Sequence, residues 1–273
     1  MINYIIIVSC LFLWGKKLEI IYQDNNIIAV NKEPGISVTH DRGGAESLTE
    51  ILQKKTKLED LRLIHRIDKD TSGILILAKN KDAQSHYSKL FEESNIRKIY
   101  LALVNGVPDD TSGEIDAPIG ECKKDSRKME INPKNGKESK TRWQLLADYG
   151  NISLVAARPL TGRTHQIRVH FQHAGFSLAI DPLYGTDDPI MLSSFKHNYK
   201  LGKFAEEKPL IERLTLCAYE LEVETHHFVA PVERKLKATI KMLTKYNSKG
   251  NAAFVNEQIF EQILAAKPLT LDI

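Results

Sequence analysis

The residue types best suited to chemistry gather in one short stretch, residues 65–73, which reads HRIDKDTSG. It places Asp68 between two basic residues, Arg66 and Lys69, and an apolar run over residues 74–78 follows at once. Such a run, rich in aliphatic residues, predicts a buried strand. A carboxylate at the edge of that strand, flanked by positive charge, can stay ionised beside a polyanion. We therefore expect Asp68 to act as a nucleophile or base on nucleic acid.

The elements that must position this stretch follow from the hydrophobic pattern. Strands are predicted at residues 18–22, 27–31, 73–79, 98–105 and 214–223, with a hairpin formed by 140–147 and 152–158 around the turn Tyr149-Gly150-Asn151. Helices are predicted at residues 46–59, 83–93, 164–174, 232–243 and 255–265. Gly175 is a suitable end for the third helix. Neighbouring strands with helices interspersed indicate an α+β class with a mixed sheet rather than a doubly wound fold.

Composition sets wide bounds. With 273 residues, 42% hydrophobic and 27% charged, the chain is an ordinary globular protein with one large domain or two small ones. The net charge of +3 does not by itself indicate nucleic acid. Residues 123–142, however, hold eight Lys or Arg against three acidic residues. This segment is either a phosphate-binding loop or a solvated loop without function.

The three cysteines, Cys10, Cys122 and Cys217, are odd in number, far apart and without CxxC spacing. A disulfide framework or a zinc site is therefore not expected, and a reducing cytoplasm fits best. Residues 4–14 are almost wholly apolar, but a bilayer span needs about 20 such residues. They also lack a basic n-region and a cleavage site, which argues against a signal peptide. We expect residues 1–17 to be an extra strand or a misassigned start.

The stretch at residues 65–73 resembles the catalytic signature of RluA-type pseudouridine synthases, which reads H-R-L-D, two free residues, then T-S-G. Three more blocks resemble the same family in the same order: residues 18–35 its opening strands, residues 97–100 its tyrosine motif and residues 158–175 its arginine motif. Ile67 stands where the family has Leu, and Cys217 stands where it has His. Four blocks in family order identify the chain, by resemblance, as a member.

This resemblance implies a pseudouridine-synthase-like α+β fold: a bent, largely antiparallel mixed sheet with flanking helices and a central cleft. Residues 18–246 would form the catalytic domain, and residues 247–273 a partly helical C-terminal tail. Many relatives carry an RNA-binding S4 domain first. Only about 17 residues precede the first block here, so a member without an S4 domain is expected.

The resemblance also implies the catalytic residues of an RNA pseudouridine synthase that flips its uridine out of the stack. Asp68 would carry the reaction, although its target, C1′, the base or a ribose proton, stays open. Arg168 would form the ion pair that keeps this carboxylate charged. Tyr100 would lie against the flipped uracil and take the C5 proton.

A second group of residues would handle the RNA. Arg66 resembles the family arginine that fills the gap left by the flipped nucleotide, with a plain phosphate contact as the alternative. His65 is expected to orient the loop, and Arg163 to contact phosphate or assist catalysis. Lys32 has a structural or RNA-contacting role. The remaining two residues expected to contact RNA are Thr71 and His165.

The reaction needs neither a redox cofactor nor ATP, and the sequence has no Gly-rich phosphate loop, so no cofactor is expected. His165, His170 and His173 are not expected to bind a metal, because their spacing does not gather them on one helix face. The expected partner is a stem-loop of ribosomal or transfer RNA, with no membrane and no obligate protein partner, for a monomer in the cytoplasm.

Two other readings compete. In a glycosidase-like hydrolase, Asp68 and Asp70 would form the carboxylate pair, but both lie on one short loop. In a non-catalytic RNA-binding protein or chaperone, the same cleft would bind RNA without reaction.

Overall fold

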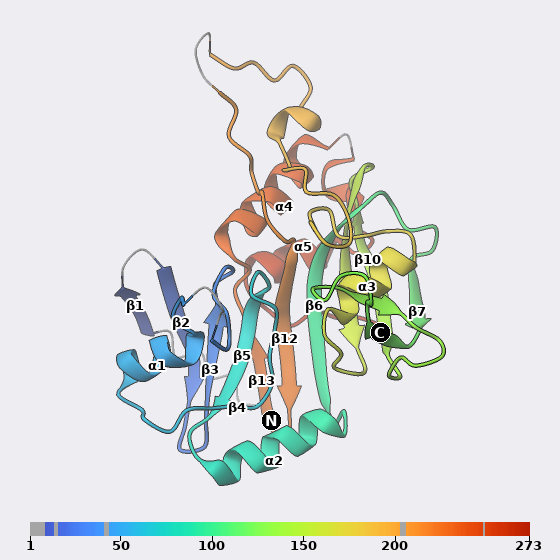
Figure 1. The fold of residues 1–273 in the computed structure, drawn as a ribbon. Helices are drawn as coiled ribbons and strands as arrows, with labels where there is room; N and C mark the ends of the chain where they lie inside the picture. Colours follow the sequence, from blue (N-terminus) through green and yellow to red (C-terminus); the bar gives the residue numbers. More distant parts are fainter. Residues whose placement is uncertain (1–8, 14–15, 41–43, 203–205, 248) are drawn as a thin grey trace. The chain divides into compact units, whose positions relative to one another are not determined.

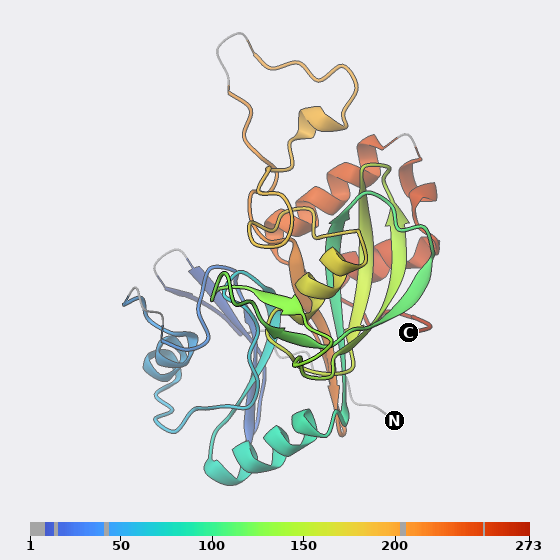
Figure 2. The same ribbon diagram turned by 45° about the vertical axis from the view of Figure 1, so that its right-hand side comes forward.

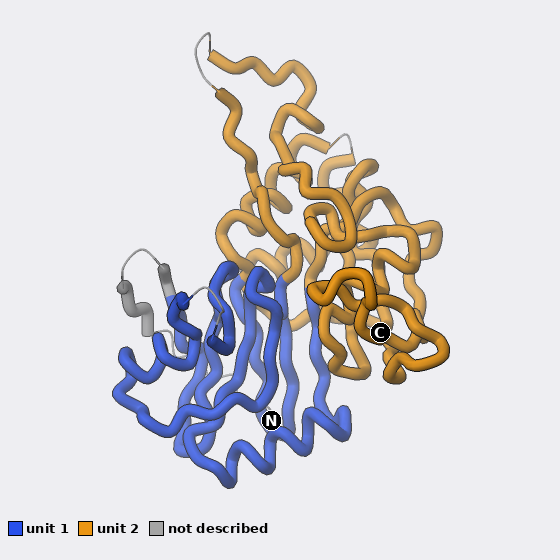
Figure 3. Tube along the Cα trace, viewed as in Figure 1, with its two compact units in different colours: residues 1–100, 217–231 blue, residues 101–216, 232–273 orange. Residues whose placement is uncertain are grey.

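The computed structural model describes residues 9–13, 16–40, 44–202, 206–247 and 249–273, and the chain divides into two compact units (Figures 1 and 3). Unit 1 comprises Met1–Tyr100 and Cys217–Pro231, and unit 2 comprises Leu101–Leu216 and Val232–Ile273. One strand, β6 (Ile96–Asn105), belongs to both, because the boundary falls after Tyr100. The fold is α+β with a large mixed sheet, as the sequence predicts.

Unit 1 contains residues 65–73 and the strands of the sheet that neighbour them. Its strands follow the order β1-β2-β3-β5-β12-β6, with β4 beside β5 and β13 beside β12. Strands β1 to β5 pair antiparallel, whereas β5 and β12 run parallel. The bounds are β1 Ser9–Leu13, β2 Lys16–Gln23, β3 Ile27–Lys32, β4 Arg62–Leu63, β5 Ser72–Ala78, β12 Leu216–Val223 and β13 His226–Val229, with helices α1 Leu48–Thr56 and α2 Lys81–Glu92.

Strand β5 is buried along its whole length because both of its faces are covered. Leu75 and Leu77 pack with Leu48 and Leu52 of α1 in one apolar cluster. Alternate residues of β5 point the other way and pack against α2, including Tyr87. The unbroken apolar run in the sequence therefore marks a strand with two cores, not an amphipathic one.

Local signals fix where the helices of unit 1 begin. The hydroxyl of Ser47 accepts from the backbone N–H of Glu50 at 3.3 Å, and the Glu50 carboxylate accepts from the N–H of Ser47 at 2.8 Å. This reciprocal capping box starts α1. Helix α2 begins at Asn80, whose side chain accepts from Ala83 N–H at 2.8 Å.

Unit 2 places an antiparallel sheet against helices. Strands follow the order β6-β11-β10-β7, and β8 and β9 form a separate two-stranded ribbon. The ribbon packs on α3 through an apolar cluster that includes Ile119, Val169 and Tyr184. The bounds are β7 Ser112–Asp116, β8 Ile119–Glu121, β9 Met129–Ile131, β10 Lys140–Asp148 and β11 Ile152–Pro159, with α3 Gln166–His173, η1 Leu192–Ser194, α4 Arg234–Tyr246, η2 Gly250–Ala253 and α5 Glu257–Leu264.

The predicted helices and strands are confirmed, including the hairpin of β10 and β11 and the helix in the C-terminal segment. Gly175 follows α3 with φ +88°, as a C-terminal glycine should. Of the apolar N-terminal stretch, residues 9–13 form a strand paired with β2, and the rest lies outside the described residues. The predicted boundaries at residues 17 and 246 stay predictions. No helix among the described residues is long and apolar enough to cross a membrane.

Candidate active site

Asp68 lies half-buried in unit 1, on the loop between β4 and β5. The backbone holds this loop. The carbonyl of Asp68 accepts from Thr71 N–H at 3.2 Å, and the carbonyl of Lys69 accepts from Gly35 N–H at 2.9 Å. The second bond ties the loop to the turn that follows β3.

Lys32, at the end of β3, links the turn after this strand to the loop that carries Asp68. Its side chain is fully buried, and its ammonium donates to the carbonyls of Glu33 at 3.1 Å, Ile36 at 3.0 Å and Lys69 at 2.8 Å. A buried ammonium needs such partners because an unpaired charge in the interior is costly. These contacts favour the structural role for Lys32; its predicted contact with RNA stays a prediction.

The T-S-G end of the stretch has a steric explanation. Gly73 has φ +106°, and a Cβ at this position would lie 2.1 Å from the backbone oxygen of Ala218. Glycine is therefore required where β5 approaches β12, in register with Ala218. Thr71 is also buried, and its hydroxyl has no hydrogen-bond partner within the part of the chain that the structure describes.

Tyr100 of β6 packs beside the α1 cluster of unit 1. Burial raises the pKa of its hydroxyl above the usual 10, and the nearby Asp68 carboxylate and Cys217 thiol raise it further. The Asp68 and Tyr100 side chains are thus close enough to interact electrostatically. At neutral pH, Tyr100 is a neutral phenol.

His65 is half-buried, and its ring is neutral. Its Nε2 accepts from the Ile76 N–H at 3.1 Å, so this nitrogen carries no proton, and its ring stacks on Phe91 at 4.3 Å. Burial and the charge of Lys98 lower the pKa of His65 to about 3. Burial also lowers the pKa of Lys98 to about 8. The predicted role of His65, which is to orient the loop without exchanging protons, stays a prediction.

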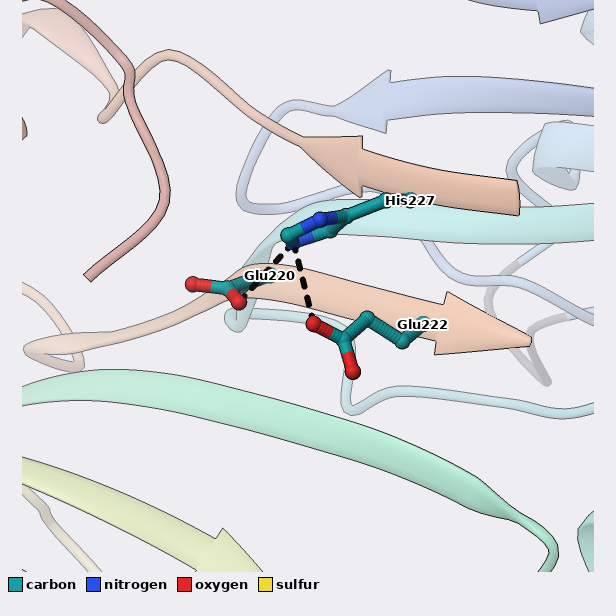
Figure 4. A group of neighbouring side chains, drawn as sticks. All are labelled: Glu220, Glu222 and His227. Atoms are coloured by element: carbon teal, nitrogen blue, oxygen red, sulfur yellow. Dashed lines mark hydrogen bonds and ion pairs between the residues drawn. The ribbon is translucent and has the colours of Figure 1, made fainter. Parts of the chain in front are cut away.

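A second polar group in unit 1 joins β6, β12 and β13 (Figure 4). The Nε2 of His227 lies 2.9 Å from the Glu220 carboxylate and 3.4 Å from that of Glu222. Arg97 donates to the same two oxygens, at 2.7 and 3.3 Å. Ligand atoms of the three residues lie within 4.8 Å of one another, as a metal site requires. Because Arg97 already donates to both of these oxygens, the group is better described as an ion-pair network that links β6 to β12.

In unit 2, α3 carries Arg168, which is 7% exposed. Its partner is Asp181, which was not among the residues predicted from the sequence. Its Nε and one terminal nitrogen donate to the Asp181 carboxylate at 2.7 and 2.8 Å. The guanidinium also lies over the ring of Tyr184, 5.0 Å from the centroid. Arg168 is thus held in one orientation. Its predicted ion pair with Asp68 links residues of different units and stays a prediction.

Asp181 is fully buried and uses its carboxylate several times over. Besides Arg168, one oxygen accepts from the backbone N–H groups of Leu183 at 3.0 Å and Tyr184 at 3.2 Å. The Tyr184 hydroxyl in turn accepts from Met129 N–H at 2.7 Å and lies 2.8 Å from His165 Nδ1. The sequence signal that could have found this loop is Asp181-Pro182-Leu183-Tyr184-Gly185, a turn with an aspartate at its start.

The start of α3 is fixed by its neighbours. Gln166 satisfies its whole amide: it accepts from the Thr161 hydroxyl and from Arg163 N–H, and it donates to the Lys140 carbonyl and the Thr141 hydroxyl. Arg163 is exposed, and its Nε donates to the Glu138 carbonyl at 2.9 Å.

The three histidines near α3 have separate surroundings. His170 is buried between the Thr141 hydroxyl at 2.8 Å and the Ala117 carbonyl at 3.0 Å. His165 faces Tyr184, and His173 is exposed.

The predicted site residues are divided between the two units. Unit 1 contains Lys32, His65, Arg66, Asp68, Thr71 and Tyr100, and unit 2 contains Arg163, His165 and Arg168.

Comparison with protein families gives a match to RNA pseudouridylate synthase over residues 26–173, more than half of the chain. This range contains every predicted site residue. Among curated proteins, the chain is 34% identical over 221 residues to "Ribosomal large subunit pseudouridine synthase D" of Borreliella burgdorferi, covering 75% of this chain and 68% of that protein. It is 40% identical over 169 residues to "Ribosomal large subunit pseudouridine synthase C" of Vibrio parahaemolyticus, covering 61% and 52%.

The chain thus spans about half to two thirds of the length of these relatives. Among solved structures, "Human RNA Pseudouridylate Synthase Domain Containing 4" is similar with a TM-score of 0.64 and 26% identity, over 82% of this chain and 92% of that one. "Human RNA Pseudouridylate Synthase Domain Containing 1" gives 0.60 and 27%, over 81% and 86%.

Proposed function

Because this chain belongs to the RNA pseudouridylate synthase family, whose members are isomerases acting on RNA, we propose that it converts specific uridines of ribosomal RNA to pseudouridine. The observation that carries this proposal is the family match over residues 26–173, which contains Asp68, Tyr100 and Arg168. The names of the curated relatives favour the large ribosomal subunit over transfer RNA as the target.

The reaction balances within the nucleotide. The bond from N1 of uracil to C1′ of the ribose breaks, a bond from C5 to C1′ forms, C5 loses its proton and N1 gains one. Asp68 supplies the carboxylate, whether it attacks C1′, adds to the base or removes a ribose proton. In each case its negative charge is consumed while the glycosidic bond is broken.

That loss of charge prepares Tyr100 for its own step. The ionised Asp68 is one cause of the raised pKa of Tyr100, second to burial. Once Asp68 is bonded or protonated, this cause disappears and the pKa of Tyr100 falls. The Tyr100 phenolate, the form that can take the C5 proton, is therefore easier to form late in the reaction. The proton that the phenol gives up in forming it supplies the one that N1 gains.

The other predicted residues hold the charges and the RNA. Arg168, oriented by Asp181, is the proposed partner that keeps Asp68 ionised. Arg66 is exposed beside Asp68, so its planar guanidinium is suited to fill the place of the flipped base. Arg163, His165, Thr71 and Lys32 are proposed to contact or support the RNA.

We further propose that the protein works as a monomer in the cytoplasm, without a cofactor or an obligate protein partner. RNA is the expected macromolecular partner, and phosphate neutralisation makes its binding salt-dependent.

The test is pseudouridine mapping of total ribosomal and transfer RNA from cells that have or lack this protein, complemented with wild type or Asp68→Asn. We expect one or a few ribosomal pseudouridines to disappear and only wild type to restore them. Changes confined to transfer RNA would correct the target. If Asp68→Asn restored the sites or the biological effect, catalysis by Asp68 would be wrong, and a non-catalytic RNA-binding role would replace it.

A further inference from the structure

The segment before β12 and the end of α4 form a group of basic and aromatic side chains in unit 2, after the family match ends at residue 173. In Figures 1 and 2 the segment around η1 extends as a long excursion near α4. Residues 191–202 contain Lys196, Lys200 and His197 and no acidic residue. The excess of positive charge on this segment needs an explanation that the proposed catalytic residues do not supply.

Helix α4 carries the same sign of charge. Its sequence, RKLKATIKMLTKY, has five basic residues and no acidic one. Leu236, Ile240 and Leu243 are buried, so an apolar side packs inward and leaves the basic residues on the other sides. Lys245, in the last turn, is stabilised there by the helix dipole. The helix dipole does not explain the position of Lys196, which lies outside α4, in residues 191–202.

The two lysines meet at one aromatic residue. The Lys196 ammonium lies 4.6 Å from the ring centroid of Tyr246, and the Lys245 ammonium lies 5.2 Å from it. Lys196 also lies 5.7 Å from the ring of Tyr199. Desolvation raises the pKa of the Tyr246 hydroxyl, but the two neighbouring positive charges outweigh this and lower it.

No carboxylate of the described residues forms an ion pair with Lys196 or Lys245, whereas the neighbouring Lys249 is paired with Asp148. Two ammonium groups beside one aromatic ring repel each other, and an anion placed between them relieves that repulsion. Lys196 lies beside the rings of both Tyr199 and Tyr246, and an aromatic ring is a surface on which a nucleobase can stack. Basic groups interleaved with aromatic rings are the pattern of sites for single-stranded nucleic acid.

We propose that Lys196, Tyr199, Lys245 and Tyr246 form a second RNA-contact site, which takes a phosphodiester of a single-stranded stretch flanking the target uridine. The inference rests on the proposed function, because RNA is then the substrate. Since the four residues lie outside the family match, this site helps to select the RNA and takes no part in the chemistry.

The test uses the full chain and a fluorescent 12-nucleotide oligouridylate, with binding followed by anisotropy at several salt concentrations. For Lys196→Gln combined with Lys245→Gln, we expect the slope of log affinity against log salt to fall by about 0.7, the value for one single-strand phosphate. At physiological salt, affinity should fall about fourfold. A charge-matched control changes Lys57 and Lys81, exposed residues of unit 1, to Gln. Its salt slope should fall less than that of the Lys196/Lys245 variant. Equal slopes for wild type and the Lys196/Lys245 variant would overturn the proposal.

Two further measurements keep the result interpretable. Chemical acetylation of wild-type protein needs no variant: the oligouridylate should protect Lys196 and Lys245, and equal reactivity with and without it would overturn the proposal. Conversion of a ribosomal RNA transcript is measured in parallel, and the double variant should keep kcat while KM rises. A wild type that binds oligouridylate through these lysines but converts no uridine would refute the proposed function while leaving the binding site intact.

Discussion

Two aspartates, Asp68 in unit 1 and Asp181 in unit 2, show how one side chain serves opposite purposes. Asp181 is fully buried, and its carboxylate accepts from Arg168 and from two backbone N–H groups. Asp68 is half-buried, and its loop is held by backbone bonds, through its own carbonyl and that of Lys69. A carboxylate surrounded by donors is stabilised as an anion. Asp181 is therefore suited to hold Arg168 in one orientation, whereas Asp68, the proposed reactive group, lies on a loop of unit 1.

The largest expected effect is the loss of RNA conversion when Asp68 is changed. Asp68→Asn keeps the shape of the side chain but removes the charge, so we expect conversion of RNA to fall at least about 10³-fold, as for loss of a nucleophile. The backbone hydrogen bonds of the loop do not depend on this charge, so the fold should be kept and the loss of activity should far exceed any change in stability. Single-turnover conversion and a thermal melt are measured together. A large loss of stability would remove the contrast with Asp181.

The second largest effect is a loss of unfolding free energy when Asp181 is changed. Asp181→Ala leaves Arg168 buried without its bidentate partner, which costs about 3–5 kcal/mol of unfolding free energy. Replacing both residues with apolar ones, Arg168→Met with Asp181→Leu, should recover part of this cost because no unpaired charge remains. Urea unfolding measures all variants. If the double variant were no more stable than Asp181→Ala, the ion pair would not explain the loss.

A third prediction concerns the support of the Asp68 loop. Burial lowers the pKa of Lys98 to about 8 in the folded protein, from 10.5 when unfolded. Between these values the unfolded chain binds more protons, so this group makes stability rise with pH, by up to about 3 kcal/mol from pH 8 to 10.5. Below pH 8 the buried Lys98 destabilises the folded protein to its full extent. Lys98→Met should therefore show a flatter stability profile over this range, measured by urea unfolding, and a higher pKa for His65 by NMR. Parallel profiles for the two proteins would contradict the prediction.

The smallest effect tests the support of Arg168. Tyr184→Phe removes the hydroxyl that accepts from Met129 N–H and faces His165, at a cost of about 1 kcal/mol. The ring stays below the Arg168 guanidinium, so activity should fall much less than in Asp68→Asn. Thermal melts and RNA conversion decide this. A loss of activity equal to that of Asp68→Asn would mean that the hydroxyl itself acts in the reaction.

Local patterns predicted most of the elements. Ser47 and Glu50 start α1, and Gly175 follows the end of α3, because caps depend on residues a few positions apart. The apolar run of β5 predicted a buried strand for the same reason. Asp181 was missed because its partner, Arg168, is reached only when α3 and the following turn fold together. The burial of Lys32 was also open, since its three carbonyl partners come from two separate loops.

The sequence by itself determined the family, the α+β class and the positions of Asp68, Tyr100 and Arg168, because motif order and hydrophobic period are properties of the linear chain. Only the tertiary structure decided which charges are satisfied and which are not. It gave Arg168 its partner Asp181, made His65 neutral and left two lysines together at Tyr246. Burial and electrostatic neighbours depend on distances between residues far apart in sequence, and these distances exist only in the folded chain.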